Sequence, residues 1–236
     1  MNEVVESKRP LVAPLWHTAV LIAIFLGLAA YGAMLQHSAQ HAPGVMERKG
    51  SAVQLYAVLL ISQWALLRFA IVGLRKGGTR LRDLIAARWS KPRDVLRDIA
   101  IALLVWAAWT GLETLATSGL GADTAKSVDA LLPRDPIEIA LWVLLSMSAG
   151  FCEETIFRGY LQRQFQAITG SAWAGLAIQA LIFGVAHGYQ GLRNTIAITL
   201  FGAVFGAVAL WRKSLAPGMI LHAWTDIFSG IFAPRV

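Results

Sequence analysis

Two adjacent glutamates, Glu153 and Glu154, are followed four positions later by Arg158 at the end of a long apolar stretch. Charged side chains in apolar surroundings are costly, and within membrane segments they usually mark a functional site. Neighbours on a helix point about 100° apart, so the two carboxylates cannot face one cavity squarely. The spacing of four favours an ion pair between Glu154 and Arg158. Glu153 is then free to act as a general base, and the alternative is a structural charge cluster at a membrane interface.

A histidine, His187, lies in the next apolar stretch, four residues after Phe183. If the chain reverses near Gly170, Glu153 and His187 lie about equally far from the turn. In an antiparallel helical hairpin the two side chains then reach nearly the same height. This geometry allows the carboxylate and the imidazole to share a water molecule or a metal ion. The alternative is a structural histidine at a helix end.

A second histidine, His222, precedes Asp226 by four residues in the last apolar stretch. This spacing puts an imidazole and a carboxylate on one face of a helix. Asp226 can orient His222 by accepting its ring proton, or it can point a polar group at a reacting carbonyl. A pair that only packs the bundle is the less favoured alternative, because two ionisable residues a turn apart are unusual in a membrane span.

The elements that position these residues are predicted to be membrane helices. The chain has 236 residues, of which 56% are hydrophobic and only 15% charged, whereas soluble domains have about 25% charged residues. We predict an all-α, polytopic membrane helical bundle that forms a single transmembrane domain over residues 1–236. About seven transmembrane helices are expected, at residues 15–35, 52–74, 99–117, 137–168, 171–187, 195–211 and 215–232. The part that carries the chemistry is 137–232.

The net charge of +7 does not indicate a nucleic-acid partner, because the basic residues lie between the hydrophobic spans. With seven spans and a cytoplasmic N-terminus, 14 basic residues lie on the inner side, including all eight from Arg75 to Arg97, and 6 on the outer side, which predicts this orientation. The single cysteine, Cys152, excludes an internal disulfide framework. His17 is predicted to lie at a membrane interface. Gly202 and Gly206 form a small-residue face that predicts close helix packing.

Together the three patterns resemble the type II CAAX prenyl endopeptidases and their bacterial relatives, the CPBP or Abi family of intramembrane proteases. The family motifs are EExxxR, FxxxH and HxxxN or HxxxD. They match this sequence at Glu153, Glu154 and Arg158, at Phe183 and His187, and at His222 and Asp226. The resemblance covers residues 137–232, and the short, Trp-containing chain is more similar to the bacterial branch. It implies an integral membrane protein of the bacterial inner membrane.

The resemblance also implies a mechanism. Glu153 and His187 would activate a water for attack on a peptide carbonyl, and His222 and Asp226 would stabilise the oxyanion. Glu154, Arg158 and Phe183 would support the site. Asp226 stands where the eukaryotic enzymes have asparagine, and an ionised aspartate would repel an oxyanion, so its role stays open.

The alternative mechanism is hydrolysis that depends on a bound metal ion. Glu153, His187 and His222 are the set that would suit zinc with an open fourth position. The sequence has no HExxH helix, and a glutamate with a histidine can activate water unaided. We therefore expect no metal cofactor and keep zinc as the alternative.

The predicted function is hydrolysis of a peptide bond in a membrane-associated protein or peptide, with the lipid bilayer as the other partner. The alternative function is a non-catalytic membrane protein on the same fold, such as an immunity or scaffold protein. Activity that depends on Glu153 distinguishes the enzyme from the scaffold.

Overall fold

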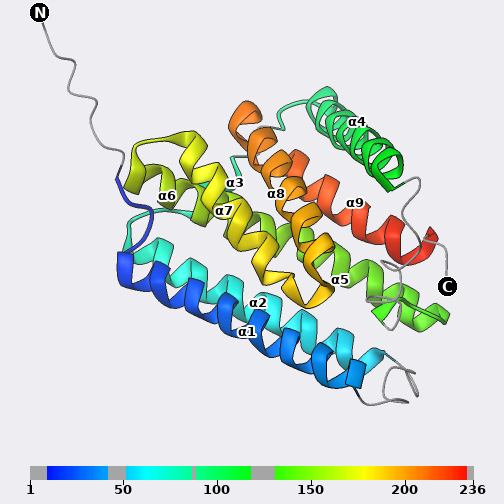
Figure 1. Cartoon of the computed structure of the whole chain (residues 1–236). Helices are drawn as coiled ribbons and strands as arrows, with labels where there is room; N and C mark the ends of the chain where they lie inside the picture. The colour runs from blue at the N-terminus through cyan, green and yellow to red at the C-terminus, as the bar shows by residue number, and fades with distance from the viewer. Residues whose placement is uncertain (1–9, 42–51, 87–88, 118–130, 233–236) are drawn as a thin grey trace, which may run out of the picture.

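The computed structural model describes residues 10–41, 52–86, 89–117 and 131–232, and every regular element in these ranges is helical (Figure 1). The helices are α1 (Leu15–His41), α2 (Val53–Lys76), α3 (Leu81–Ile85), α4 (Pro92–Thr117), α5 (Pro136–Glu154), α6 (Gln162–Thr169), α7 (Ala172–Ala186), α8 (Leu192–Arg212) and α9 (Ala216–Phe232). A π-helical segment, η2 (Thr155–Leu161), continues α5 into α6, and a short 3-10 turn, η3 (Gly188–Gln190), joins α7 to α8. The predicted all-α class is confirmed.

Five helical segments within the described ranges are long and apolar enough to cross a membrane: Leu15–Leu35, Val53–Lys76, Pro92–Leu115, Pro136–Thr169 and Leu192–Arg212. The other two predicted spans form α7, of 15 residues, and α9, of 17 residues. Both are shorter than the 18 residues taken here as the minimum length of a membrane span. All seven predicted segments are therefore helices, and five have the dimensions of a span. Residues 1–9 and 42–51, which contribute to the predicted orientation, lie outside the described residues.

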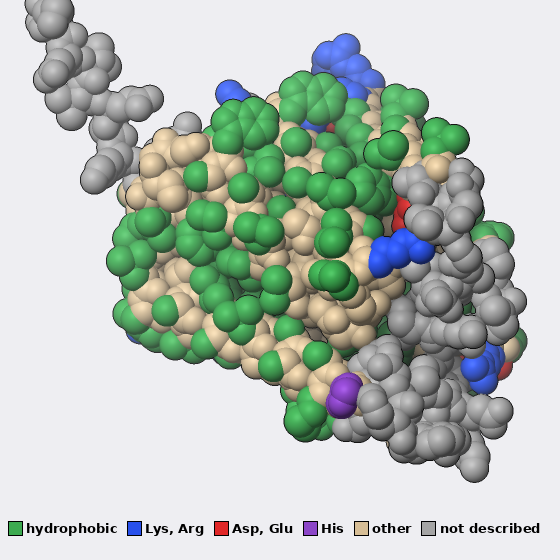
Figure 2. Space-filling model, in the orientation of Figure 1, with side chains coloured by type: hydrophobic (Ala, Val, Ile, Leu, Met, Phe, Trp, Pro, Cys, Tyr) green, Lys and Arg blue, Asp and Glu red, His purple; other side chains and the backbone are tan. Residues whose placement is uncertain are grey.

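The surface of the bundle is suited to lipid. Figure 2 shows apolar side chains spread over the face formed by α1, α7 and α8, with the visible Lys and Arg side chains at its edges. Large apolar side chains are strongly exposed on several helices, for example Leu104 and Leu181. In water such a surface would favour aggregation. Exposure of the same side chains to the hydrocarbon of a bilayer has no such free-energy cost.

The rod formed by α5, η2 and α6 is the centre of the bundle. It packs against α2 and α9 along α5 and against α7 along α6, while α8 packs on α7. Helix α4 lies at the edge, where its main neighbour is α9 (Figure 1). Ile156, Phe157 and Tyr160 of η2 are almost fully buried in the main apolar core, together with residues of α1 and α2.

Local sequence signals set the bounds of this rod. The Asp135 side chain accepts hydrogen bonds from the backbone N–H groups of Ile137 and Glu138 at the start of α5, and Pro136 occupies the first turn, where its missing N–H costs nothing. At the other end Gly170 adopts the left-handed conformation, with φ 74°. Ser171 then caps α7 through Ala174 N. The chain reversal predicted near Gly170 is thereby confirmed.

The structure also shows the surroundings of the predicted small-residue face of α8 and of His17. A Cβ atom on Gly202 would lie 3.0 Å from Phe183 Cδ1, and one on Gly206 would lie 2.8 Å from Gln162 Oε1, so the predicted close packing of this face is confirmed. His17, predicted to lie at a membrane interface, is enclosed by the protein at the start of α1. Its side chain is buried and its Nδ1 lies 3.0 Å from the hydroxyl of Tyr160, because α1 packs on the central rod.

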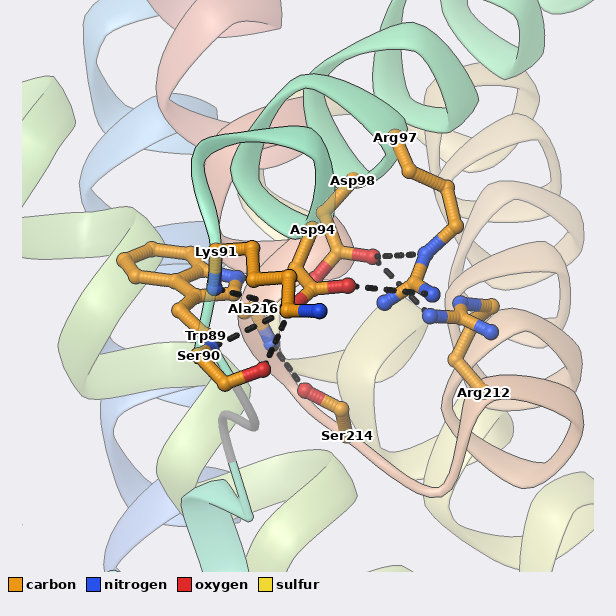
Figure 3. Close-up of polar contacts among 9 residues, drawn as sticks. All are labelled: Trp89, Ser90, Lys91, Asp94, Arg97, Asp98, Arg212, Ser214 and Ala216. Atoms are coloured by element: carbon orange, nitrogen blue, oxygen red, sulfur yellow. Dashed lines mark hydrogen bonds and ion pairs between the residues drawn. The ribbon is translucent and has the colours of Figure 1, made fainter.

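A polar cluster joins the start of α4 to the end of α8 (Figure 3). The carboxylate of Asp98, which is 2% exposed, accepts a hydrogen bond from Trp89 Nε1 at 2.9 Å and from Arg212 Nη2 at 3.1 Å. Arg97 also pairs with Asp98, at 3.5 Å. These contacts hold one end of the peripheral helix α4 against the bundle.

Candidate active site

The ion pair predicted between Glu154 and Arg158 lies at the centre of the bundle, where α5 passes into η2. Arg158 Nη1 donates to Glu154 Oε1 at 2.9 Å, and both side chains are buried. The Arg158 guanidinium carbon lies 4.3 Å from the ring centre of Phe183 and 4.7 Å from that of Phe205. Its Nη2 also donates to the backbone oxygen of Gly202 at 3.0 Å. Glu154 is thus a neutralised, fixed carboxylate.

His222 of α9 contacts the same carboxylate. Its Nδ1 lies 3.0 Å from Glu154 Oε1, so an Nδ1–H donates to this oxygen. This hydrogen bond directs Nε2 toward two further carboxylates, Glu153 Oε2 at 3.8 Å and Asp226 Oδ2 at 3.7 Å. The close approach of α9 depends on Gly218, where a Cβ atom would lie 3.0 Å from Glu154 Oε2.

The orientation of His222 therefore differs from one of the predicted possibilities. The ring proton on Nδ1 goes to Glu154, and Asp226 lies beyond hydrogen-bond distance of Nε2. The reason is the packing of α9 on α5: Asp226 is one turn from His222 on its own helix, whereas Glu154 reaches Nδ1 of the ring from α5. Glu154 joins Arg158 to His222.

Glu153 is the glutamate without an ion pair to Arg158, as the helical geometry predicted. Its side chain is 22% exposed, whereas that of Glu154 is 1% exposed. Its Oε2 atom is buried and has no hydrogen-bond partner. A buried carboxylate oxygen without a partner has an unused acceptor position, which a water molecule can occupy.

His187 lies at the C-terminal end of α7. Its Nδ1 is 2.8 Å from the backbone oxygen of Phe183, so Nδ1–H donates to this carbonyl and leaves Nε2 as an acceptor. The Phe183 ring contacts both histidines, with ring centres 4.8 Å from His187 and 6.1 Å from His222. Within the described part of the chain His187 forms no direct hydrogen bond or ion pair with Glu153.

Tyr189 is a site residue that the sequence analysis missed. It lies in η3, with its ring centre 6.3 Å from that of His187, and α1 packs over it at Gly32. Burial raises the pKa of the Tyr189 phenol, a hydrogen bond from Gln190 opposes this shift, and the nearby carboxylates of Glu153 and Asp226 add to it. The only sequence signal was its position two residues after His187.

The proposed zinc ligands do not converge. Across the described ranges, no group of three or more His, Cys, Asp or Glu side chains is arranged to hold a metal ion. His222 Nδ1 is used by Glu154, and its Nε2 faces two carboxylate oxygens at distances longer than hydrogen bonds. As placed, Glu153, His187 and His222 therefore do not fit a resident metal ion.

The fold and the buried charges define a class: a polytopic helical membrane protein with an ionisable site inside its bundle. Residues 135–228 match the family model described as Type II CAAX prenyl endopeptidase Rce1-like. The match runs from the start of α5 into α9 and contains all three motifs. No curated protein and no solved structure matches the chain. The predicted resemblance is confirmed over this segment, and at the level of the family it supports a membrane-embedded endopeptidase.

Proposed function

We propose that this endopeptidase cleaves a membrane-associated protein near its C-terminus or at a membrane-proximal segment, by water that Glu153 activates. One observation carries the proposal. His222, fixed by Glu154, turns Nε2 toward Glu153 and Asp226, with gaps of 3.8 and 3.7 Å. The Glu153 oxygen that lies 3.8 Å from Nε2, Oε2, is also the one without a hydrogen-bond partner. A water bound there has a carboxylate acceptor on one side and an imidazole on the other.

The first step is attack on the peptide carbonyl. Glu153 accepts a proton from the water while the water oxygen bonds to the carbonyl carbon, which gives a tetrahedral intermediate with an oxyanion. His187 assists as a second acceptor, because its Nδ1–H is committed to Phe183 and its Nε2 is available. The intermediate collapses when the C–N bond breaks and the protonated Glu153 returns its proton to the leaving amine.

His222 is proposed to stabilise the oxyanion. With Nδ1–H donated to Glu154, a protonated ring presents Nε2–H on the side of the reacting atoms. Donors fixed before the reaction begins need no reorganisation when charge develops. Asp226, whose side chain is 38% exposed, lies at the outer side of Nε2 and holds the protonated ring by charge. In this arrangement Asp226 acts on His222 and does not need to touch the oxyanion.

Arg158 and Phe183 are positioning residues in this scheme. Arg158 holds Glu154 in the orientation that receives His222, and Phe183 packs on Arg158 and on both histidines. The charge distribution of the sequence supports a cytoplasmic N-terminus, and we place the protein in a bacterial inner membrane.

The test compares Glu153→Gln with Glu113→Gln, a matched change at an exposed glutamate of α4. Protein N-termini are identified by mass spectrometry in membranes of cells that express each form. New N-termini are expected with wild type and E113Q and not with E153Q. A synthetic peptide that spans one such cleavage site should be hydrolysed at least about 100-fold more slowly by purified E153Q, because a general base typically contributes that much or more.

Full hydrolysis by correctly folded E153Q contradicts the proposal. A cellular phenotype that survives E153Q, His187→Ala and His222→Ala would instead support the non-catalytic scaffold.

A further inference from the structure

An open pocket of about 740 Å³ lies where α6, the start of α7 and the end of α8 meet. Its lining includes Arg158, Gln162, Arg163, Trp173, Trp211 and Lys213. Glu153, His187, His222 and Asp226 are not among its lining residues, and Arg158 takes part in both the pocket and the site described above. A volume of this size is within the range of small-molecule sites, roughly 300–1,000 Å³.

Two buried polar atoms on residues that line the pocket have no partner. Gln162 is 2% exposed, and its Nε2 donates to Gly206 O, which leaves Oε1 as an unused acceptor. Arg158 is 1% exposed, and its Nε is an unused donor because only its two terminal nitrogens are bonded. Buried polar groups left without partners are destabilising, so this lining favours a ligand that supplies both an acceptor and a donor.

The rim of the pocket is cationic. Arg163 and Lys213 contribute positive charge, and no acidic side chain lines the pocket. The Arg163 guanidinium donates to the backbone oxygens of Asp83 and Leu84. Arg212 is held by Asp98 (Figure 3). Lys213 is exposed and, among the described residues, has no hydrogen bond or ion pair. It also adopts the left-handed conformation, with φ 51°, which is unfavourable for a residue with a side chain.

Two tryptophans place the pocket at the level of lipid headgroups. Trp173 is 71% exposed near the start of α7, and Trp211 is 67% exposed near the end of α8. These two helix ends lie at the same end of the bundle (Figure 1). Tryptophans at the ends of membrane helices are enriched at the interface between hydrocarbon and water.

We propose that this pocket binds the headgroup of an anionic phospholipid that carries hydroxyl groups, of the phosphatidylglycerol type. The phosphate pairs with Lys213 at the rim, where basic side chains attract anionic lipid. A headgroup hydroxyl donates to Gln162 Oε1, and an oxygen accepts from Arg158 Nε. The lipid thereby contacts the guanidinium that holds Glu154. The site goes beyond peptide hydrolysis and stands independently of it.

The test uses the full chain in detergent and native mass spectrometry, with short-chain phosphatidylglycerol as the probe. Dioctanoyl phosphatidylcholine and dioctanoyl phosphatidylmethanol test charge and hydroxyl groups, and inorganic phosphate tests the lipid origin of the anion. The variant is Lys213→Asn, because asparagine tolerates the left-handed conformation and so should fold. Lys91→Asn, an exposed lysine outside the pocket, is the matched control.

Wild type and K91N are expected to bind phosphatidylglycerol at least about fivefold more tightly than phosphatidylcholine. K213N should lose about fivefold in affinity for phosphatidylglycerol, and phosphatidylmethanol should bind about fivefold more weakly than phosphatidylglycerol to the wild type. Equal binding of the three lipids, or an equal effect of K213N and K91N, overturns the proposal. Displacement of the lipid by inorganic phosphate at equal concentration overturns its assignment to a lipid.

Discussion

The ion pair between Glu154 and Arg158 offers the sharpest test of how the site is held together. Changing Glu154 to glutamine keeps the shape and an acceptor oxygen but removes the negative charge, so the buried guanidinium keeps only neutral partners such as Gly202 O and the Phe183 and Phe205 rings. At 2.9 Å two unit charges attract by roughly 6 kcal/mol with an effective dielectric constant of about 20. Desolvation offsets part of this attraction. Breaking such a pair from one side typically costs about 3–5 kcal/mol, which is the expected loss for E154Q.

The matched variants are Arg158→Met and the double variant E154Q/R158M. Methionine is an unbranched, uncharged side chain that can pack between the Phe183 and Phe205 rings. R158M leaves Glu154 with His222 as its remaining side-chain partner. The double variant removes both charges, and its loss should be smaller than the sum of the single losses by about 2 kcal/mol.

The assay is reversible unfolding of the purified protein in mixed micelles with increasing SDS, followed by tryptophan fluorescence. The nine tryptophans of the chain provide the signal. Additive losses in the double variant would refute the reasoning, because they would mean that the two charges do not stabilise one another. Losses below about 1 kcal/mol in both single variants would show that water reaches the pair.

Two further predictions concern stability. Tyr189 has a pKa above its ordinary value of 10.0, so above about pH 10 the unfolded chain loses this proton before the folded protein does. Stability should therefore fall as pH rises through 10, and Tyr189→Phe should reduce the slope of this fall in SDS unfolding measured between pH 8 and 11; equal slopes would contradict the placement of the phenol. Gly202→Ala should cost about 1–3 kcal/mol, because its Cβ would meet Phe183. Gly111→Ala, with open space at its Cβ, should be neutral or slightly stabilising; equal effects of the two changes would argue against close packing at Gly202.

The sequence alone determined the class of fold and identified the motif residues of the candidate site, though not Tyr189. Charges are rare in membrane helices, so the glutamates at 153 and 154 and the histidines at 187 and 222 were prominent against their apolar surroundings. Helical periodicity was enough to divide the glutamates and to pair Glu154 with Arg158, because this contact lies within one turn of a single rod. The turn at Gly170 could be predicted because its backbone conformation suits glycine.

Tertiary structure decided every contact between helices. The hydrogen bond from His222 to Glu154 depends on how α9 packs on α5, and helical spacing favoured Asp226 as the partner instead. The covering of Tyr189 by Gly32 and the burial of His17 depend on where α1 packs. Periodicity fixes which side chains share a face of one helix. Which helix covers that face is set by shape and by small residues such as Gly218 and Gly202, whose missing side chains become informative only once their neighbours are in place.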